Sequence, residues 1–216
     1  MSEPIASPET KAKETVRIEA FSDGVFAIAI TLLILEIHVP EFREGETLLH
    51  GLSHEWASFL AFLIGFFTLL VCWINHHYMF SMIHRSNSRL LLFNGFKLLV
   101  VTVTPFATAL LAENIQTEWR QSAVTTYSFN FALMGMAMTS LWLYSAFKGF
   151  VSTEPGKLKV INGYYILASV LSISIWAVSY INIICSMILF VFMFVIFVFP
   201  ETVVTYVVKR SGREAQ

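Results

Sequence analysis

Two short clusters of polar residues interrupt the apolar stretches of this sequence, where an unpaired ionisable group is costly. Arg17, Ser22 and Asp23 stand at the entrance of the run GVFAIAITLLILEI, and the sequence WINHH closes the next apolar stretch at 73–77. Because the chain would cross in one direction along the first stretch and return along the second, both clusters fall at a similar depth. The candidate hydrogen-bond partners of the Asp23 carboxylate are Trp73, Asn75 and His77. We predict a polar network that fixes the first helix against the second.

The same residue types allow two other kinds of chemistry. Asp23, His76 and His77 could bind a metal ion, but adjacent side chains on a helix point about 100° apart and do not readily share one ion. Two histidines at positions i and i+4 would be better placed to do so. Asp23 and His77 could instead relay protons, since imidazole changes its charge near neutral pH. We favour polar packing over both alternatives.

The composition indicates a membrane protein. Of the 216 residues, 56% are hydrophobic and only 13% are charged, which is unusual for a soluble domain. A helix needs roughly 20 mostly apolar residues to cross the hydrocarbon core of a bilayer. Six runs reach that length, at approximately 16–39, 54–82, 88–112, 121–147, 158–179 and 182–206. We predict an all-α membrane protein with six transmembrane helices in a single domain, residues 1–216, with short tails at about 1–15 and 207–216.

The basic residues indicate the orientation of this domain. Of the 14 Lys and Arg residues, only Arg43 and Arg120 fall on one side of the six-helix arrangement, and Lys97 lies inside a helix. The others lie on the opposite side, and basic residues are enriched in cytoplasmic loops. Both termini are therefore predicted to be cytoplasmic. Residues 1–15 lack the apolar core of a signal peptide, so we expect the first helix to be retained.

Several classes of function are disfavoured by the sequence. A net charge of −1 and the lack of interleaved basic and aromatic residues argue against nucleic-acid binding. Cys72 and Cys185 lie in apolar runs and suggest neither a disulfide framework nor a metal site. The sequence contains no G-x-S-x-G, no H-E-x-x-H, no Gly-rich phosphate loop and no T-V-G-Y-G. We therefore expect no enzyme activity, no cofactor and no potassium filter built from backbone carbonyls.

The first polar cluster also carries a family resemblance. Arg17-x-x-x-Phe21-Ser22-Asp23 opens the first transmembrane helix and Asn-His-His ends the second, so the sequence resembles the transmembrane-protein-175 family of potassium channels. The resemblance implies a prokaryotic homotetramer of six-helix subunits in the plasma membrane. It also implies that the first helix of each subunit lines a central pore, with bulky aliphatic side chains at the constriction. The matching positions here are Ile28, Thr31, Leu32 and Leu35.

These four positions occupy one face of roughly 100° on an α-helix, although a helix packed in any bundle shows the same spacing. The Thr31 hydroxyl could contact a cation or bond a carbonyl of its own helix. The expected function is a potassium-selective or potassium-preferring cation channel in a lipid bilayer, with potassium ions as the permeant species. Two alternatives stay open: a proton-coupled secondary transporter that uses Asp23 and His77, and a membrane scaffold without a transport role.

Overall fold

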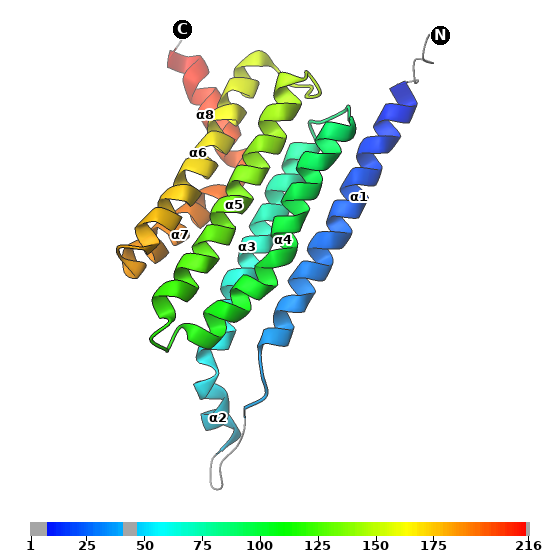
Figure 1. The fold of residues 1–216 in the computed structure, drawn as a ribbon. Coiled ribbons are helices and arrows are strands. Elements are labelled where there is room, and N and C mark those ends of the chain that lie inside the picture. Colours follow the sequence, from blue (N-terminus) through cyan, green and yellow to red (C-terminus); the bar gives the residue numbers. More distant parts are fainter. Residues whose placement is uncertain (1–7, 41–46, 215–216) are drawn as a thin grey trace.

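The computed structural model describes residues 8–40 and 47–214, and almost all of them are helical (Figure 1). In chain order the elements are α1 (Pro8–Leu32), the 3₁₀ turn η1 (Leu33–Glu36), α2 (Leu48–His54), α3 (Trp56–Phe80), α4 (Ser88–Asn114), α5 (Arg120–Phe147), α6 (Pro155–Ser179), α7 (Ile183–Phe197) and α8 (Pro200–Glu214). The predicted tails therefore lie partly outside the described residues.

Most of the predicted helices agree with the structure. The second to fifth predicted spans overlap α3, α4, α5 and α6 with similar ends. The first helix begins earlier than predicted, at Pro8, and its last turn tightens into η1, which ends at Glu36. A separate short helix, α2, precedes α3, and the two helices meet at Glu55.

The sixth predicted span, 182–206, is wrong as one continuous helix. The structure divides it into α7 and α8, which are bent by 75° relative to each other. Pro200 explains the break, because proline has no N–H to continue a helix and disfavours the helical conformation of the residue before it. Proline is well suited to the first turn of a new helix, and Pro200 begins α8.

Among the described residues, four helices are long and apolar enough to cross a membrane: α1 with η1, α3, α4 and α6. The bent pair of α7 and α8 makes a fifth if it counts as one span. The remaining long helix, α5, has 28 residues but carries polar side chains that bond inside the protein. Asn130 donates to Thr104 of α4 at 3.0 Å, and Thr139 donates to the Tyr165 carbonyl of α6 at 2.6 Å. These two bonds pair polar side chains of α5 with neighbouring helices, within the bundle.

The helices form an elongated bundle with α1 at one edge, as Figure 1 shows. α1 packs mainly against α3 and α4, and α5 packs between α4 and α6. The beginning of α1 and the end of α8 lie at the same end of the bundle, whereas α2 lies at the opposite end. The two polar clusters found in the sequence therefore both lie toward the end where α1 begins.

Candidate functional site

α1 buries a single narrow stripe against the bundle. The buried residues of this stripe, each 0–7% exposed, are Thr15, Ile18, Ser22, Phe26 and Ala29, and Leu33 continues it at the start of η1. Their spacing of three or four residues is that of one helix face. Most of the remaining surface of α1 is exposed in the single chain, and only 28% of its membrane-length apolar window is buried. The helix thus has a wide face left for lipid, for other subunits or for a pathway between subunits.

The four positions predicted to line a pore all lie on this exposed face. Ile28, Leu32 and Leu35 are 62%, 44% and 68% exposed, and Thr31 is also exposed. The Thr31 hydroxyl donates to the Ile28 carbonyl at 2.9 Å, a local bond that serine and threonine often make in helices. Leu35 lies in η1, where the tighter 3₁₀ spacing replaces that of the α-helix. All four side chains are directed away from the core of their own chain.

Asp23 is joined to α3 by an indole. The Nε1 of Trp73 donates to Oδ1 of Asp23 at 2.8 Å, a distance typical of a charge-assisted hydrogen bond. The Trp73 ring stacks on the ring of His77 one turn farther along α3, with the centroids 5.9 Å apart and the planes 28° from parallel. Trp73 is thus the partner of Asp23, and His77 supports the indole that makes the bond.

Ser22 connects α1 to α4, a contact that was not predicted from the sequence. Its hydroxyl donates to the Ile18 carbonyl at 2.8 Å and accepts from Nδ2 of Asn94 at 3.1 Å. Ser22 is fully buried and Asn94 is only 3% exposed. An amide side chain within an apolar helix is a sequence signal for such a contact, because a buried polar group needs a partner.

A buried lysine and histidine connect α3 to α4. The Nζ of Lys97 lies 2.7 Å from Nδ1 of His76, and both side chains are almost completely buried. Phe26 of α1 covers the pair, with its ring centroid 4.8 Å from Nζ. Which of these two nitrogens donates depends on whether Nδ1 or Nε2 of the imidazole carries the proton. This Nε2 has no hydrogen-bond partner among the described residues. The sequence placed Lys97 inside a helix but did not indicate its partner.

These contacts define a polar layer of six residues: Ser22, Asp23, Trp73, His76, Asn94 and Lys97. One bond joins α1 to α3, a second joins α1 to α4, and a third joins α3 to α4, so the three bonds close a triangle of helices. A rotation of α1 about its own axis would break two of them. The polar layer therefore sets which face of α1 points away from the bundle.

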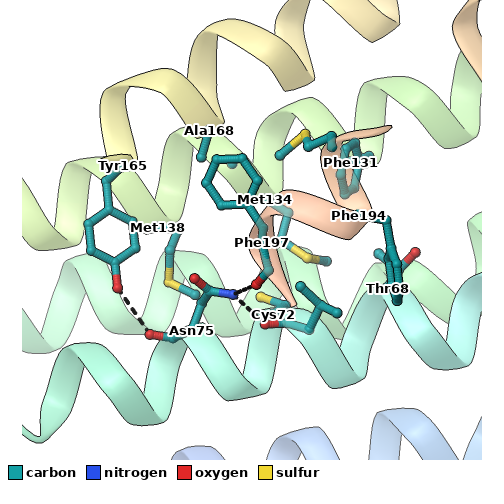
Figure 2. Close-up of a pocket in the computed structure, with 13 residues that line it drawn as sticks. Thr68, Cys72, Asn75, Phe131, Met134, Met138, Tyr165, Ala168, Phe194 and Phe197 are labelled. Atoms are coloured by element: carbon teal, nitrogen blue, oxygen red, sulfur yellow. Dashed lines mark hydrogen bonds between the residues drawn. The ribbon is translucent and has the colours of Figure 1, made fainter. Parts of the chain in front are cut away.

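Asn75, a candidate partner of Asp23, bonds on the other side of α3. It follows Trp73 by two residues, which is about 200° around a helix. Its Nδ2 donates to the Phe197 carbonyl at 2.8 Å, and its Oδ1 accepts from the Tyr164 hydroxyl at 2.8 Å. The Tyr165 hydroxyl donates to the Asn75 carbonyl at 3.1 Å (Figure 2). Asn75 thus ties α3 to α6 and to the end of α7, where the chain bends into α8.

A small cavity of about 70 Å³ lies beside Asn75, between α3, α5, α6 and α7. Figure 2 shows Met134 and Met138 of α5 and Phe194 and Phe197 of α7 among its lining residues. Because most of these side chains are apolar, the cavity is unsuited to a hydrated cation. It belongs to the packing around the bend of α7.

Arg17 and Phe21 lie beside the polar layer. Both line an open groove between α1 and the beginning of α4, together with Asn87 and Ser88. Phe21 is 67% exposed, and Arg17 is exposed as well. These two side chains therefore lie on the surface that α1 presents outside its own chain.

The helices that carry the polar layer also match a known family. A family model described as "Endosomal/lysosomal potassium channel TMEM175" matches residues 17–105, a segment that runs from α1 into α4. A potassium channel of Chamaesiphon minutus is 45% identical over 144 residues, which cover 66% of this chain and 70% of that protein. The chain belongs to the TMEM175 family. Membership confirms the resemblance noted in the sequence.

Further TMEM175 relatives differ in how much of their length aligns. A potassium channel of Streptomyces collinus is 44% identical over 131 residues, 60% of this chain and 63% of that protein. The crystal structure of a lysosomal potassium-selective channel TMEM175 homolog from Chamaesiphon minutus is similar with a TM-score of 0.77 at 37% identity, covering 89% of this chain and 98% of that one. The human relative, named an endosomal/lysosomal proton channel, is 36% identical over 99 residues, 42% of this chain and 20% of its own length.

Proposed function

We propose that this TMEM175 chain forms a potassium-selective or potassium-preferring cation channel. The channel is a homotetramer of six-helix subunits in the plasma membrane of a prokaryote, with both termini in the cytoplasm. α1 of each subunit lines the central pathway, where Ile28, Leu32 and Leu35 form apolar rings beside the Thr31 hydroxyl. Potassium ions pass along their gradient without a cofactor, and no substrate is transformed.

The observation that carries this proposal is the placement of α1. One stripe of the helix is held by the polar layer, while the four candidate pore positions lie on its wide exposed face. Apolar rings on that face suit a constriction that limits conduction by its size and by dewetting. The names of two bacterial relatives and of the similar crystal structure support potassium as the ion.

In this proposal the polar layer sets the register of the pore helix. Asp23 and Ser22 hold α1 on two neighbouring helices at once. A rotation of α1 by one residue, about 100°, would turn Ile28 out of the pathway and bring a neighbouring side chain into it. The layer therefore acts on conduction through geometry and does not itself contact the ion.

Reconstitution into KCl-loaded liposomes tests the proposed function. Dilution into a potassium-poor buffer drives potassium outward, and a protonophore lets protons enter in exchange, which a pH-sensitive dye reports. A channel predicts a dye response that requires both the protein and the potassium gradient and that weakens when sodium replaces internal potassium. Valinomycin, added last, gives the total capacity of the vesicles. If protein-containing vesicles respond no more than empty ones, the proposed function is wrong.

Proton conduction is the second candidate, because the human relative is named a proton channel. The same vesicles separate the two ions when the protonophore is left out and valinomycin carries the compensating potassium current. A dye response under that condition reports protons that cross through the protein itself, with Asp23 and His77 as the candidate titratable groups. A fixed ratio of protons to potassium ions would instead indicate a proton-coupled transporter, and a scaffold would move neither ion.

A further inference from the structure

Two histidines on α2 face each other in a way that the proposed channel does not use. The Nε2 atoms of His50 and His54 lie 3.3 Å apart, and the ring centroids lie 4.7 Å apart. Because the nitrogens are closer together than the ring centres, the Nε2 edges of the two rings are turned toward each other. Both side chains are exposed, so an ion from solution can reach them.

The distance between these nitrogens fits two ligands of one tetrahedral ion. A zinc–nitrogen bond measures about 2.0–2.1 Å, and two such bonds at the tetrahedral angle hold their nitrogens about 3.3–3.4 Å apart. The same distance also allows a hydrogen bond between the two imidazoles, so the experiment below distinguishes the two interpretations. The i, i+4 spacing also places both side chains on one face of the helix, which is the spacing of the two histidines in helical zinc motifs.

α2 is short, and a side-chain hydrogen bond lies at each of its ends. At its beginning, the Thr47 hydroxyl accepts from the backbone N–H of His50 at 3.3 Å. At its end, the Glu55 carboxylate accepts from the Ser58 hydroxyl at 3.2 Å, across the junction with α3. The Nε2 atoms of the two imidazoles already lie 3.3 Å apart, so little reordering is needed to bind an ion.

We propose that His50 and His54 bind a divalent transition-metal ion, with zinc as the best fit to their spacing. Imidazole is a good ligand for zinc, copper and nickel, whereas calcium and magnesium prefer oxygen. Within the described part of the chain, no group of three or more His, Cys, Asp or Glu side chains could hold a metal ion. Water therefore completes the coordination shell, and the ion exchanges with solution.

This site is separate from the polar layer in space and in chemistry. Figure 1 shows α2 at the end of the bundle opposite to the beginning of α1. The pair also differs from His76 and His77, which are adjacent in the sequence: His76 lies against Lys97, and His77 stacks on Trp73. The inference does not depend on ion conduction, so it stands or falls independently of the proposed function.

Calorimetric titration of zinc chloride into the purified full-length protein tests the site. We expect about one zinc ion per chain. His50→Gln and His54→Gln should each weaken binding by at least tenfold, since disturbing even a residue outside the coordination shell costs roughly 10–100-fold in metal affinity. The matched control is His84→Gln, which removes an exposed histidine from the connection between α3 and α4. This control should bind zinc like the wild type, and magnesium chloride should produce no binding heat.

Thermal unfolding of the same four proteins separates loss of the site from loss of the fold. Without zinc, all of them should unfold at the same temperature, because the substituted side chains are exposed. With zinc, only the wild type and His84→Gln should gain stability, since a ligand stabilises the state that binds it. Equal zinc affinity in all four proteins would place the ion elsewhere, and absence of binding would leave the pair as a hydrogen bond. Either result overturns the inference. Potassium flux measured in the presence of a chelator, which removes zinc, tests the channel independently of this site.

Discussion

Replacing Asn75 by leucine should destabilise the protein at the bend between α7 and α8. Leucine keeps the γ-branched shape of asparagine and is larger, so the change removes hydrogen bonds without opening a cavity. The Phe197 carbonyl and the Tyr164 hydroxyl each lose a bond of 2.8 Å. Asn75 is 5% exposed and Tyr164 is 6% exposed, so water cannot readily replace the lost partner.

The expected size of this effect follows from the number of groups left unpaired. A buried polar group without a partner costs about 1–3 kcal/mol, so two of them cost about 2–6 kcal/mol per chain. In a chain of this length, 1 kcal/mol shifts the midpoint of thermal unfolding by about 2–4 °C. We therefore expect Asn75→Leu to lower the midpoint by at least ~4 °C. Tyr164→Phe removes one of the two bonds and should cause about half of that shift.

Thermal unfolding in detergent, followed by the loss of the native peak in size-exclusion chromatography, measures these shifts. Thr102→Ala is a suitable control, because the Thr102 hydroxyl is exposed and bonds only within its own helix, to the Leu99 carbonyl. The double variant of Asn75 and Tyr164 should be less destabilised than the sum of the single variants, since both changes remove the same bond. The reasoning is refuted if Asn75→Leu shifts the midpoint no more than Thr102→Ala.

Four further substitutions probe α1 and its bond to α3. Asp23→Ala leaves the Trp73 indole N–H without its bond, which is exposed in the single chain, so the expected cost is about 0.5–1.5 kcal/mol in each copy. Cross-linking should show less tetramer, and Trp73→Phe should cause a similar loss. Normal tetramer yield and flux in both variants would contradict the polar layer. Gly24→Ala adds a methyl group that meets nothing within 4 Å in its own chain and should favour the helix by up to about 1 kcal/mol. If position 24 faces another copy or the pathway, as the proposed channel requires, potassium flux should fall while helicity by circular dichroism stays unchanged. Unchanged flux and assembly would show that this position faces neither. Ile28→Asn replaces the proposed apolar ring at position 28 by a ring of amides that holds water. Potassium flux from vesicles should rise, and discrimination between potassium and sodium should fall. A decrease in flux would argue against a constriction at this level.

The sequence predicted the positions of most helices because each one follows an apolar run with a clear beginning and end. α4 begins at Ser88, as predicted, and the side chain of Asn87 before it accepts from the Leu90 N–H at 2.9 Å. The bend before α8 was not predicted, because the run at 182–206 is long enough to span a bilayer without interruption. Pro200 carried the signal for a break, but the length of the apolar run favoured one continuous helix.

The polar layer could be predicted only in part. Depth along the helices placed Asp23 level with the cluster at 73–77, but depth does not specify which way each side chain points. Helical spacing shows that Trp73 and Asn75 cannot face the same neighbour, and the structure is needed to tell which of them faces α1. Asn94 and Lys97 were missed as partners because nothing in the sequence indicates that α4 is the other neighbour of α1.

The proposed channel requires that α1 lines the ion pathway, and cysteine accessibility tests this requirement directly. The background should lack both native cysteines, because Cys185 is exposed and would react. In that background, cysteines are introduced one at a time at the four candidate positions, Ile28, Thr31, Leu32 and Leu35, and at two control positions on α7, Ile184 and Ile188. The controls are 70% and 63% exposed, close to the 68% of Leu35 and the 62% of Ile28.

Potassium flux from vesicles is then measured before and after addition of silver ions or a charged thiol reagent. If α1 lines the pathway, modification at positions 28, 31, 32 and 35 blocks the flux, and modification at the two α7 positions leaves it unchanged. If the α7 cysteines react and block the flux while the α1 cysteines remain inaccessible, α1 does not line the pathway.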